Sequence, residues 1–156
     1  MLKALTIAIA LHATGAEADL RSLDLSGARA ADAYWAKINF ANADFYRADL
    51  ANASFRNARL EGAQFRETTL RSAVLAGATC TSANFKLADL RGADLSATDL
   101  RGANFEDVKV FGVNLNGAQT GDNPDCHVDV SAEGDGSQRV RVAEWLAGPP
   151  TGGSGG

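Results

Sequence analysis

"ADLRGADLSATDLRGANF", residues 88–105, repeats one pattern every five residues. A large apolar residue stands at the centre of each five-residue unit: Leu90, Leu95, Leu100 and Phe105. Five residues advance an α-helix by about 500°, so a helix would spread these residues around its circumference instead of gathering them on one face. An ordinary half-buried strand requires a period of two. The stretch therefore fits neither regular structure in its usual form.

The same register extends beyond this stretch in both directions without an insertion. Twenty units can be centred on every fifth residue from Leu20 to Leu115, and sixteen of the twenty centres are Leu or Phe. Two residues before the centre, fourteen of the twenty positions are Ala, the exceptions being Leu23, Ile38, Thr68, Thr98, Val108 and Val113. The other positions are mostly polar or Gly, so the pattern is small, polar, large, polar, polar for about a hundred residues.

One backbone arrangement places all the apolar residues of this pattern on the inside. If each unit forms one side of a square, four units close a coil, and the large and small apolar residues of every unit point into the tube. Coils stacked at the strand spacing of about 4.8 Å share backbone hydrogen bonds. The sequence thus predicts an all-β solenoid of about five coils over residues 18–118. Glycines at 27, 62, 77, 92, 102, 112 and 117 suit corners that require a positive φ.

Units such as "ADLRG", "ANFED" and "ADLAN" resemble the A(D/N)Lxx pattern of the pentapeptide-repeat family. The resemblance covers residues 18–118 and implies a right-handed quadrilateral β-helix. It implies less about function, because one fold hosts many functions. Some members of the family protect or inhibit DNA gyrase and resemble B-form DNA in width and acidity.

Sorting the centres one in four predicts the interior columns of the tube. One column contains Leu25 and then Phe45, Phe65, Phe85 and Phe105, which we expect to stack ring on ring as a pure core element. Cys80 occupies a centre position of another column, so we expect a buried apolar residue and no disulfide with Cys126. Whether Cys126 is free or paired between chains is left open.

The two flanks of the repeat are expected to cover its open ends. Residues 1–17 fit either a structural cap, because Leu5, Ile7, Ile9 and Leu11 alternate with smaller residues, or a secretory signal ending at "AEA", residues 16–18. The first interpretation, which we favour, predicts a cytoplasmic protein, and the second an exported, periplasmic or lumenal one.

The C-terminal flank, residues 119–148, is predicted to be a capping hairpin and a short helical turn. Its apolar residues Val128, Val130, Val140, Val142, Trp145 and Leu146 would cover the last coil. Residues 149–156, "PPTGGSGG", are predicted to be a disordered tail or an added linker.

Residues that could carry chemistry are few. Five acids, Asp122, Asp125, Asp129, Glu133 and Asp135, could hold Ca²⁺, but their spacing is not that of an EF-hand, so a solvated loop is the better interpretation. Cys126 and His127 are adjacent and would point to opposite faces of a strand. We therefore predict no enzyme activity, no cofactor and no metal site.

The charge distribution distinguishes between a DNA mimic, a nucleic-acid binder and a protein-binding rod. Residues 18–118 contain twelve acids and twelve bases, and the net charge of −4 comes from residues 119–156, with six acids against Arg139 and Arg141. A DNA mimic requires a negative field and a nucleic-acid binder a basic excess, and the repeat region has neither. The apolar run near the N-terminus is too short to span a bilayer. We expect a non-catalytic rod that binds a protein partner or acts as a scaffold, with a gyrase-directed DNA mimic as the alternative.

One surface column is a candidate for that interaction. The positions just after the centres on one face are Ala31, Ala51, Arg71, Arg91 and Phe111. The arginines could simply pair with Asp49 and Asp89 as a surface ion-pair network, which is the interpretation we favour. Alternatively, Arg71 and Arg91 could grip a carboxylate of the partner, with Phe111 as the anchor. Tyr34 and Tyr46 are weaker candidates for a second contact, and a homodimer through a capped end is a further possibility.

Overall fold

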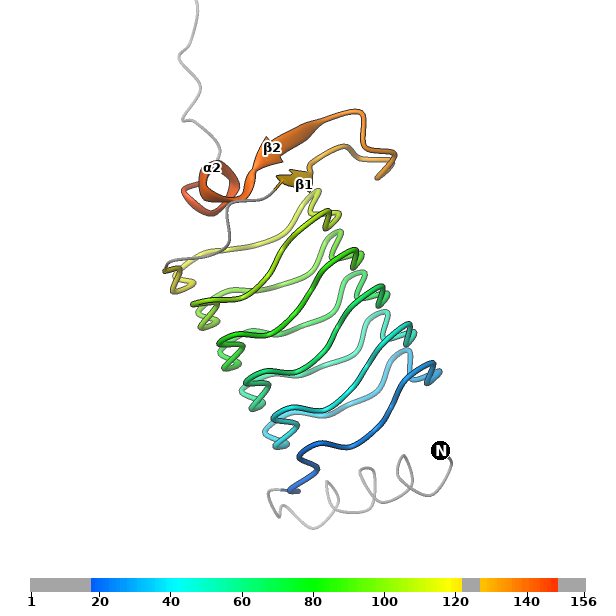
Figure 1. The fold of residues 1–156 in the computed structure, drawn as a ribbon. Helices are drawn as coiled ribbons and strands as arrows, with labels where there is room; N and C mark the ends of the chain where they lie inside the picture. The colour runs from blue at the N-terminus through cyan, green and yellow to red at the C-terminus, as the bar shows by residue number, and fades with distance from the viewer. Residues whose placement is uncertain (1–17, 122–126, 149–156) are drawn as a thin grey trace, which may run out of the picture.

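The computed structural model describes residues 18–121 and 127–148. Residues 18–121 wind into a stack of coils that rises from the blue N-terminal end to the yellow C-terminal end in Figure 1. Isolated parallel bridges join residues that are twenty positions apart, from Asp19 with Asn39 to Asp99 with Gln119. One turn of the coil therefore takes four of the five-residue units. The predictions for residues 1–17, Cys126 and residues 149–156 lie outside the described residues.

The coils are joined by one hydrogen-bonding rule that repeats along the rod. The N–H of a centre residue donates to the carbonyl nineteen residues further on, as from Phe65 to Asn84 at 2.7 Å. The N–H of the residue before the centre donates to the carbonyl twenty-one residues back, as from Gln64 to Ala43 at 2.9 Å. These are the bonds of a parallel ladder, and they satisfy the backbone groups of each coil by the coils on either side.

The interior of the tube is filled by the centre residues and by the small residues two positions before them. We number the four walls in chain order, so that walls 1, 2, 3 and 4 contain the centres Phe40, Phe45, Leu50 and Phe55, each of which is fully buried. In wall 2 the rings of Phe45, Phe65, Phe85 and Phe105 stack in parallel, with successive centroids 4.9, 5.0 and 5.3 Å apart. The predicted phenylalanine column is confirmed.

Two threonines replace alanine in the small position without leaving a polar group unpaired. Thr68 and Thr98 are buried, and their hydroxyls donate to the carbonyls of Phe45 at 2.7 Å and Leu75 at 2.9 Å. A buried hydroxyl is tolerated when it has such an acceptor. The backbone of the preceding coil provides that acceptor.

Each corner of the tube places the second residue after a centre in the left-handed region. The seven corner glycines named above all have positive φ, as the sequence predicts, and residues with side chains adopt it too, such as Leu87 at 61° and Ala97 at 53°. The Asp or Asn before the centre supports the turn by accepting the N–H of the residue after the centre. Examples are Asp44 with Tyr46 at 2.8 Å and Asn84 with Lys86 at 3.1 Å. The D/N of the repeat is therefore a turn-forming acceptor.

The segment after the coils forms an antiparallel pair of strands, β1 (His127–Asp129) and β2 (Arg139–Arg141), followed by the helix α2 (Val142–Leu146). These elements lie across the end of the coil stack (Figure 1). Val128 and Val142 are fully buried in the core, and the Trp145 ring meets Phe105 edge-on at 5.1 Å. The described residues contain no helix that is long and apolar enough to cross a membrane.

Strand β1 continues the register of the repeat. Asp129 bridges Lys109, twenty residues earlier, its N–H donates to Val108 at 2.8 Å, and its carbonyl accepts from Val110 at 2.8 Å. Val130 accordingly falls on the next centre position of wall 3. The intervening positions Thr120 and Asp125 are not apolar, so the sequence pattern alone does not extend this far.

Candidate functional site

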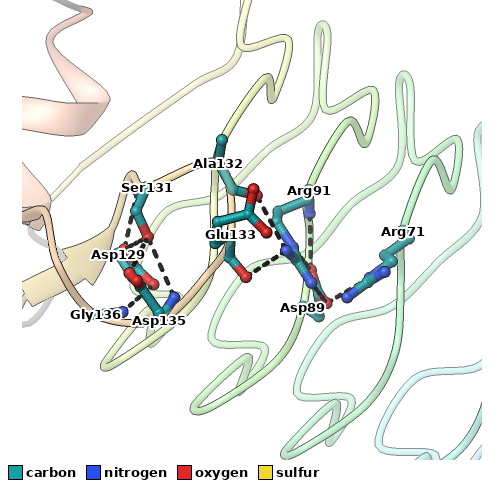
Figure 2. Close-up of polar contacts among 9 residues, drawn as sticks. All are labelled: Arg71, Asp89, Arg91, Asp129, Ser131, Ala132, Glu133, Asp135 and Gly136. Carbon is teal, nitrogen blue, oxygen red and sulfur yellow. Dashed lines mark hydrogen bonds and ion pairs between the residues drawn. The ribbon is translucent and has the colours of Figure 1, made fainter.

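The predicted arginine column lies on wall 3 and is linked by one carboxylate. Arg71 donates from Nε to Oδ2 of Asp89 at 2.6 Å, and Arg91 donates from Nε to Oδ1 at 2.8 Å and from Nη2 to Oδ2 at 2.7 Å (Figure 2). Asp89 thus separates two guanidiniums that would otherwise repel each other. Asp49, the other predicted partner, instead accepts the N–H of Ala51 at 3.2 Å.

Arg91 has a second set of contacts that the sequence did not predict. Its Nη1 donates to the carbonyls of Ala132 at 3.1 Å and Glu133 at 2.7 Å, in the loop between β1 and β2 (Figure 2). The Arg91 side chain is only 14% exposed, whereas that of Arg71 is 55% exposed. Arg91 therefore attaches the C-terminal unit, which consists of β1, β2, their connecting loop and α2, to the coils of the rod. Arg71 is the solvent-facing member of the pair.

The same loop is organised from within by Asp129. Its Oδ1 accepts the N–H of Ser131 at 2.9 Å and the hydroxyl of Ser131 at 2.6 Å, and its Oδ2 accepts the N–H of Gly136 at 2.8 Å. Burial raises the pKa of Asp129, but these hydrogen bonds outweigh burial and leave the pKa below its ordinary value. The prediction that the acids of this segment are solvated is wrong for Asp129, which is 6% exposed because it occupies a repeat position in register with Lys109.

Phe111, at the C-terminal end of the column, is the exposed aromatic residue that the sequence predicts there. It is 52% exposed and lines a groove of about 610 Å³ between the last coil and the C-terminal unit. The other lining residues are Val110, Gly112, Val113, Val130, Val140, Glu144 and Trp145. The groove is therefore mainly apolar, with the Glu144 carboxylate as its charged group.

The two tyrosines lie on other walls. Tyr34 is 53% exposed on wall 4. Tyr46, on wall 2, lies beside the guanidiniums of Arg47 and Arg66, which are 4.9 and 5.7 Å from the centre of its ring. Glu67 binds Arg47 at 2.7 Å and thereby completes a surface cluster around Tyr46. The structure brings Arg71 and Arg91 together and places Phe111 next in their column, but it does not bring the tyrosines to that column.

In residues 18–121 and 127–148, the side chains that could bind a metal are those of His, Cys, Asp and Glu, and Cys could also act as a nucleophile. No three His, Cys, Asp or Glu residues of these ranges form a group that could hold a metal ion. Cys80 is a free thiol inside the tube, and burial, with the nearby Glu61 and Asp99, raises its pKa. A buried thiol with a raised pKa is a poor nucleophile.

The surface charges of the rod are largely paired with one another. Ion pairs join Arg21 to Asp19, Arg59 to Glu61, Lys86 to Glu106 and Arg101 to Asp99, in addition to those already described. The pairing follows from the repeat itself, since the residues on either side of one centre, or residues of successive coils on the same wall, lie within reach of each other. Acidic and basic side chains therefore alternate and pair with one another on the surface of the rod.

A model of the pentapeptide repeat region matches residues 28–105, half of the chain. The chain belongs to the pentapeptide-repeat family. Solved structures of such proteins resemble this one, and they are known as right-handed β-helices. A search of curated protein sequences gave no significant match.

Two cyanobacterial pentapeptide-repeat proteins are similar over most of the chain. One, from Cyanothece 51142, has 24% identity and a TM-score of 0.66, with 81% of this chain and 99% of that chain covered. The other, from Nostoc PCC 7120, has 26% identity and a TM-score of 0.50, with 74% and 94% covered.

A third structure is that of QnrB1, a plasmid-mediated fluoroquinolone resistance protein. It has 20% identity and a TM-score of 0.42, with 64% of this chain and 56% of that chain covered. A likeness of this degree carries no argument about function.

Proposed function

We propose that this pentapeptide-repeat protein is a non-catalytic binding module: a rigid rod that presents a fixed surface to a protein partner. The observation that carries the proposal is Phe111, a large aromatic side chain that is 52% exposed beside an apolar groove of about 610 Å³. Exposed aromatic residues next to apolar hollows are typical of interaction sites, because binding removes their surface from water.

The arginine column supports this surface in two different ways. The Arg71 side chain is 55% exposed, and Asp89 engages its Nε, while its terminal nitrogens make no hydrogen bond within residues 18–121 and 127–148 and can therefore meet a carboxylate of the partner. Arg91 is engaged by Asp89 and by the loop, so its part is to hold the C-terminal unit that forms one side of the groove. The interaction surface that we propose therefore consists of Phe111, the groove and Arg71, with Tyr34 and Tyr46 as separate, secondary candidates.

The body of the rod, in this proposal, has about five coils, and β1, β2 and α2 cover part of its C-terminal end. Trp145 ends the phenylalanine column by packing on Phe105, and Val128 and Val142 are fully buried. This cap pairs with the last coil on walls 2 and 3, where the N–H of Asp107 donates to the carbonyl of His127 and that of Val110 to the carbonyl of Asp129, and there it prevents the coil from pairing with other chains. A second copy bound through this end is the alternative partner, and sedimentation velocity over a range of concentrations distinguishes it from a heterologous one.

The test of the proposal is partner capture by matched variants. Phe111→Ala and Arg71→Gln leave the interior untouched, and we expect each to reduce the recovery of a specific partner from source-cell extract. Leu87→Ala is the control, because Leu87 is the exposed large aliphatic residue of wall 2 and lies away from the groove. A partner that is captured equally by wild type, Phe111→Ala and Arg71→Gln would contradict the proposal.

The gyrase-directed alternative has its own test. Because the rod's charges are balanced and largely paired, we expect no inhibition of DNA supercoiling and no protection from fluoroquinolones at micromolar protein. Inhibition that disappears on changing Asp44, Asp49, Asp89 and Asp94 to Asn would establish the alternative. Asn retains the acceptor that each of these turns requires, so the substitutions remove charge without removing the turn hydrogen bond.

A further inference from the structure

The last coil leaves a set of ladder groups without a partner on wall 4. One coil earlier, Leu95 N–H donates to Asn114 at 2.8 Å, Ala97 N–H donates to Asn116 at 2.9 Å, and the carbonyl of Ala93 accepts from Asn114 at 3.0 Å. The equivalent groups in the last coil are the N–H of Leu115, the N–H of Gly117 and the carbonyl of Val113. In residues 18–121 and 127–148, none of the three has a hydrogen-bond partner.

The sequence explains why the chain does not cover this edge itself. Continued past Val130, the five-residue register would place Glu133 in the small position and Asp135 in the centre position above wall 4. Two carboxylates cannot enter an apolar tube without a large desolvation cost. The chain leaves the register instead, and Arg91 holds the departing carbonyls of Ala132 and Glu133 against wall 3 (Figure 2).

The apolar side chains at this edge are also more exposed to solvent than their equivalents one coil earlier. Leu95 is fully buried, whereas Leu115, Val113 and Ala118 are only partly buried at the end of the same tube. Val113 also lines the groove of about 610 Å³ beside Phe111 and Trp145. An apolar floor thus lies next to unpaired backbone donors and an unpaired acceptor, which is the combination that an added strand requires.

We propose that this edge binds an extended segment of a partner protein as an added parallel strand. The segment places a small residue above Val113 and a large apolar residue above Leu115, as a next coil would, and its backbone pairs with Leu115, Gly117 and Val113. It carries Lys or Arg beside these residues, because the charged side chain that lines the groove is the carboxylate of Glu144. The inference rests on the proposed function and specifies the partner's form and charge.

A short peptide tests this directly. The probe is Gly-Ala-Lys-Leu-Lys-Ala-Thr, which copies residues 92–98 with lysine at the positions of Asp94 and Ser96. At ten times its dissociation constant, we expect hydrogen exchange of the Leu115 and Gly117 amides in the full chain to slow about tenfold. The amides of Leu95 and Ala97, which are already paired, should not change. A control peptide with Glu in place of its Leu should protect neither edge amide.

Two charge variants test whether the carboxylate of Glu144 attracts the basic side chains of the bound segment. Glu144→Lys should weaken binding of the basic peptide by about two- to fivefold, as expected for an exposed charge pair. Glu106→Lys makes the same change of net charge at a partly exposed residue of wall 2 that does not line the groove, and it should leave the affinity unchanged.

Three results would overturn the inference. They are the absence of edge-amide protection up to the solubility limit of the peptide, equal protection by the Glu control peptide, and concentration-dependent protection in the free protein together with a dimer in sedimentation. The last result would identify a second copy as the occupant. Failure of the peptide with retention of Phe111-dependent partner capture would leave the proposed function standing, so the two failures are distinguishable.

Discussion

Arg91 binds both carboxylate oxygens of Asp89 and, with its remaining terminal nitrogen, two carbonyls of the C-terminal loop. The same two-residue pair recurs between Arg101 and Asp99, with bonds of 2.9 and 2.6 Å. There the arginine is 61% exposed, whereas the side chain of Arg91 is 14% exposed. One repeat position therefore yields a surface ion pair in one coil and a tether between two parts of the protein in another.

This difference makes the first prediction a matched comparison. Arg91→Gln should lower the free energy of unfolding by about 1–3 kcal/mol, because charged hydrogen bonds to a partly buried carboxylate and to loop carbonyls are lost. It should also speed hydrogen exchange in residues 131–138. Arg101→Gln should cost less than about 1 kcal/mol, as expected for an exposed pair. Denaturant unfolding of both variants checks this, and equal losses would show that Arg91 is not a tether.

The phenylalanine column of wall 2 gives the second prediction. Phe65→Ala or Phe85→Ala should cost about 3–5 kcal/mol, since each ring is fully buried and stacked on both sides. Phe111→Ala should change stability by no more than about 0.5 kcal/mol, because that ring is exposed. Retention of wild-type thermal stability by either column variant would contradict the assignment of the walls.

The turn-forming aspartates give a pH dependence. Hydrogen bonds from Ser96 to Asp94 and from Arg101 to Asp99 lower the pKa of both carboxyls in the folded protein. A lowered pKa means that the folded state favours the ionised carboxyl. The resulting stabilisation is complete above the pKa of the unfolded chain, about 4, and is lost as the pH falls below it through the pKa values of the folded protein. We expect the melting temperature to be flat from pH 7 to about 5 and to decline below about 4. With Asp94 and Asp99 both changed to Asn, the decline should be shallower, and an unchanged acid limb would contradict this account.

The period alone predicts the interior of the rod, because every position's direction is set by its place in the five-residue unit. That is why the column from Phe45 to Phe105 and the positive φ of the corner glycines could be predicted. The role of Asp and Asn before each centre was missed, although the repetition of D/N in "ADL" and "ANF" was a visible signal of a shared backbone contact. The fit of Asp129 and Val130 to the register was not predictable, because the polar residues Thr120 and Asp125 occupy the two centre positions before Val130.

The candidate site was predictable only in part. The column of Arg71, Arg91 and Phe111 follows from the period, and so does the proximity of Asp89. The contacts of Arg91 with Ala132 and Glu133 do not, because they depend on where a loop outside the repeat returns to the rod. The groove beside Phe111 is likewise formed by residues far apart in the chain, such as Val113, Val140 and Trp145, and no local pattern predicts it.

Site-specific photo-crosslinking tests the central claim most directly. The photoreactive residue p-benzoylphenylalanine is introduced at Phe111 and, as the control, at Ala31, an exposed residue of the same column at the other end of the rod. If the Phe111 surface is the binding site, irradiation in source cells gives a covalent adduct with a specific protein from position 111 and none from position 31. No adduct from position 111, or the same adducts from both positions, would contradict the claim that this end of the rod is a protein-binding surface.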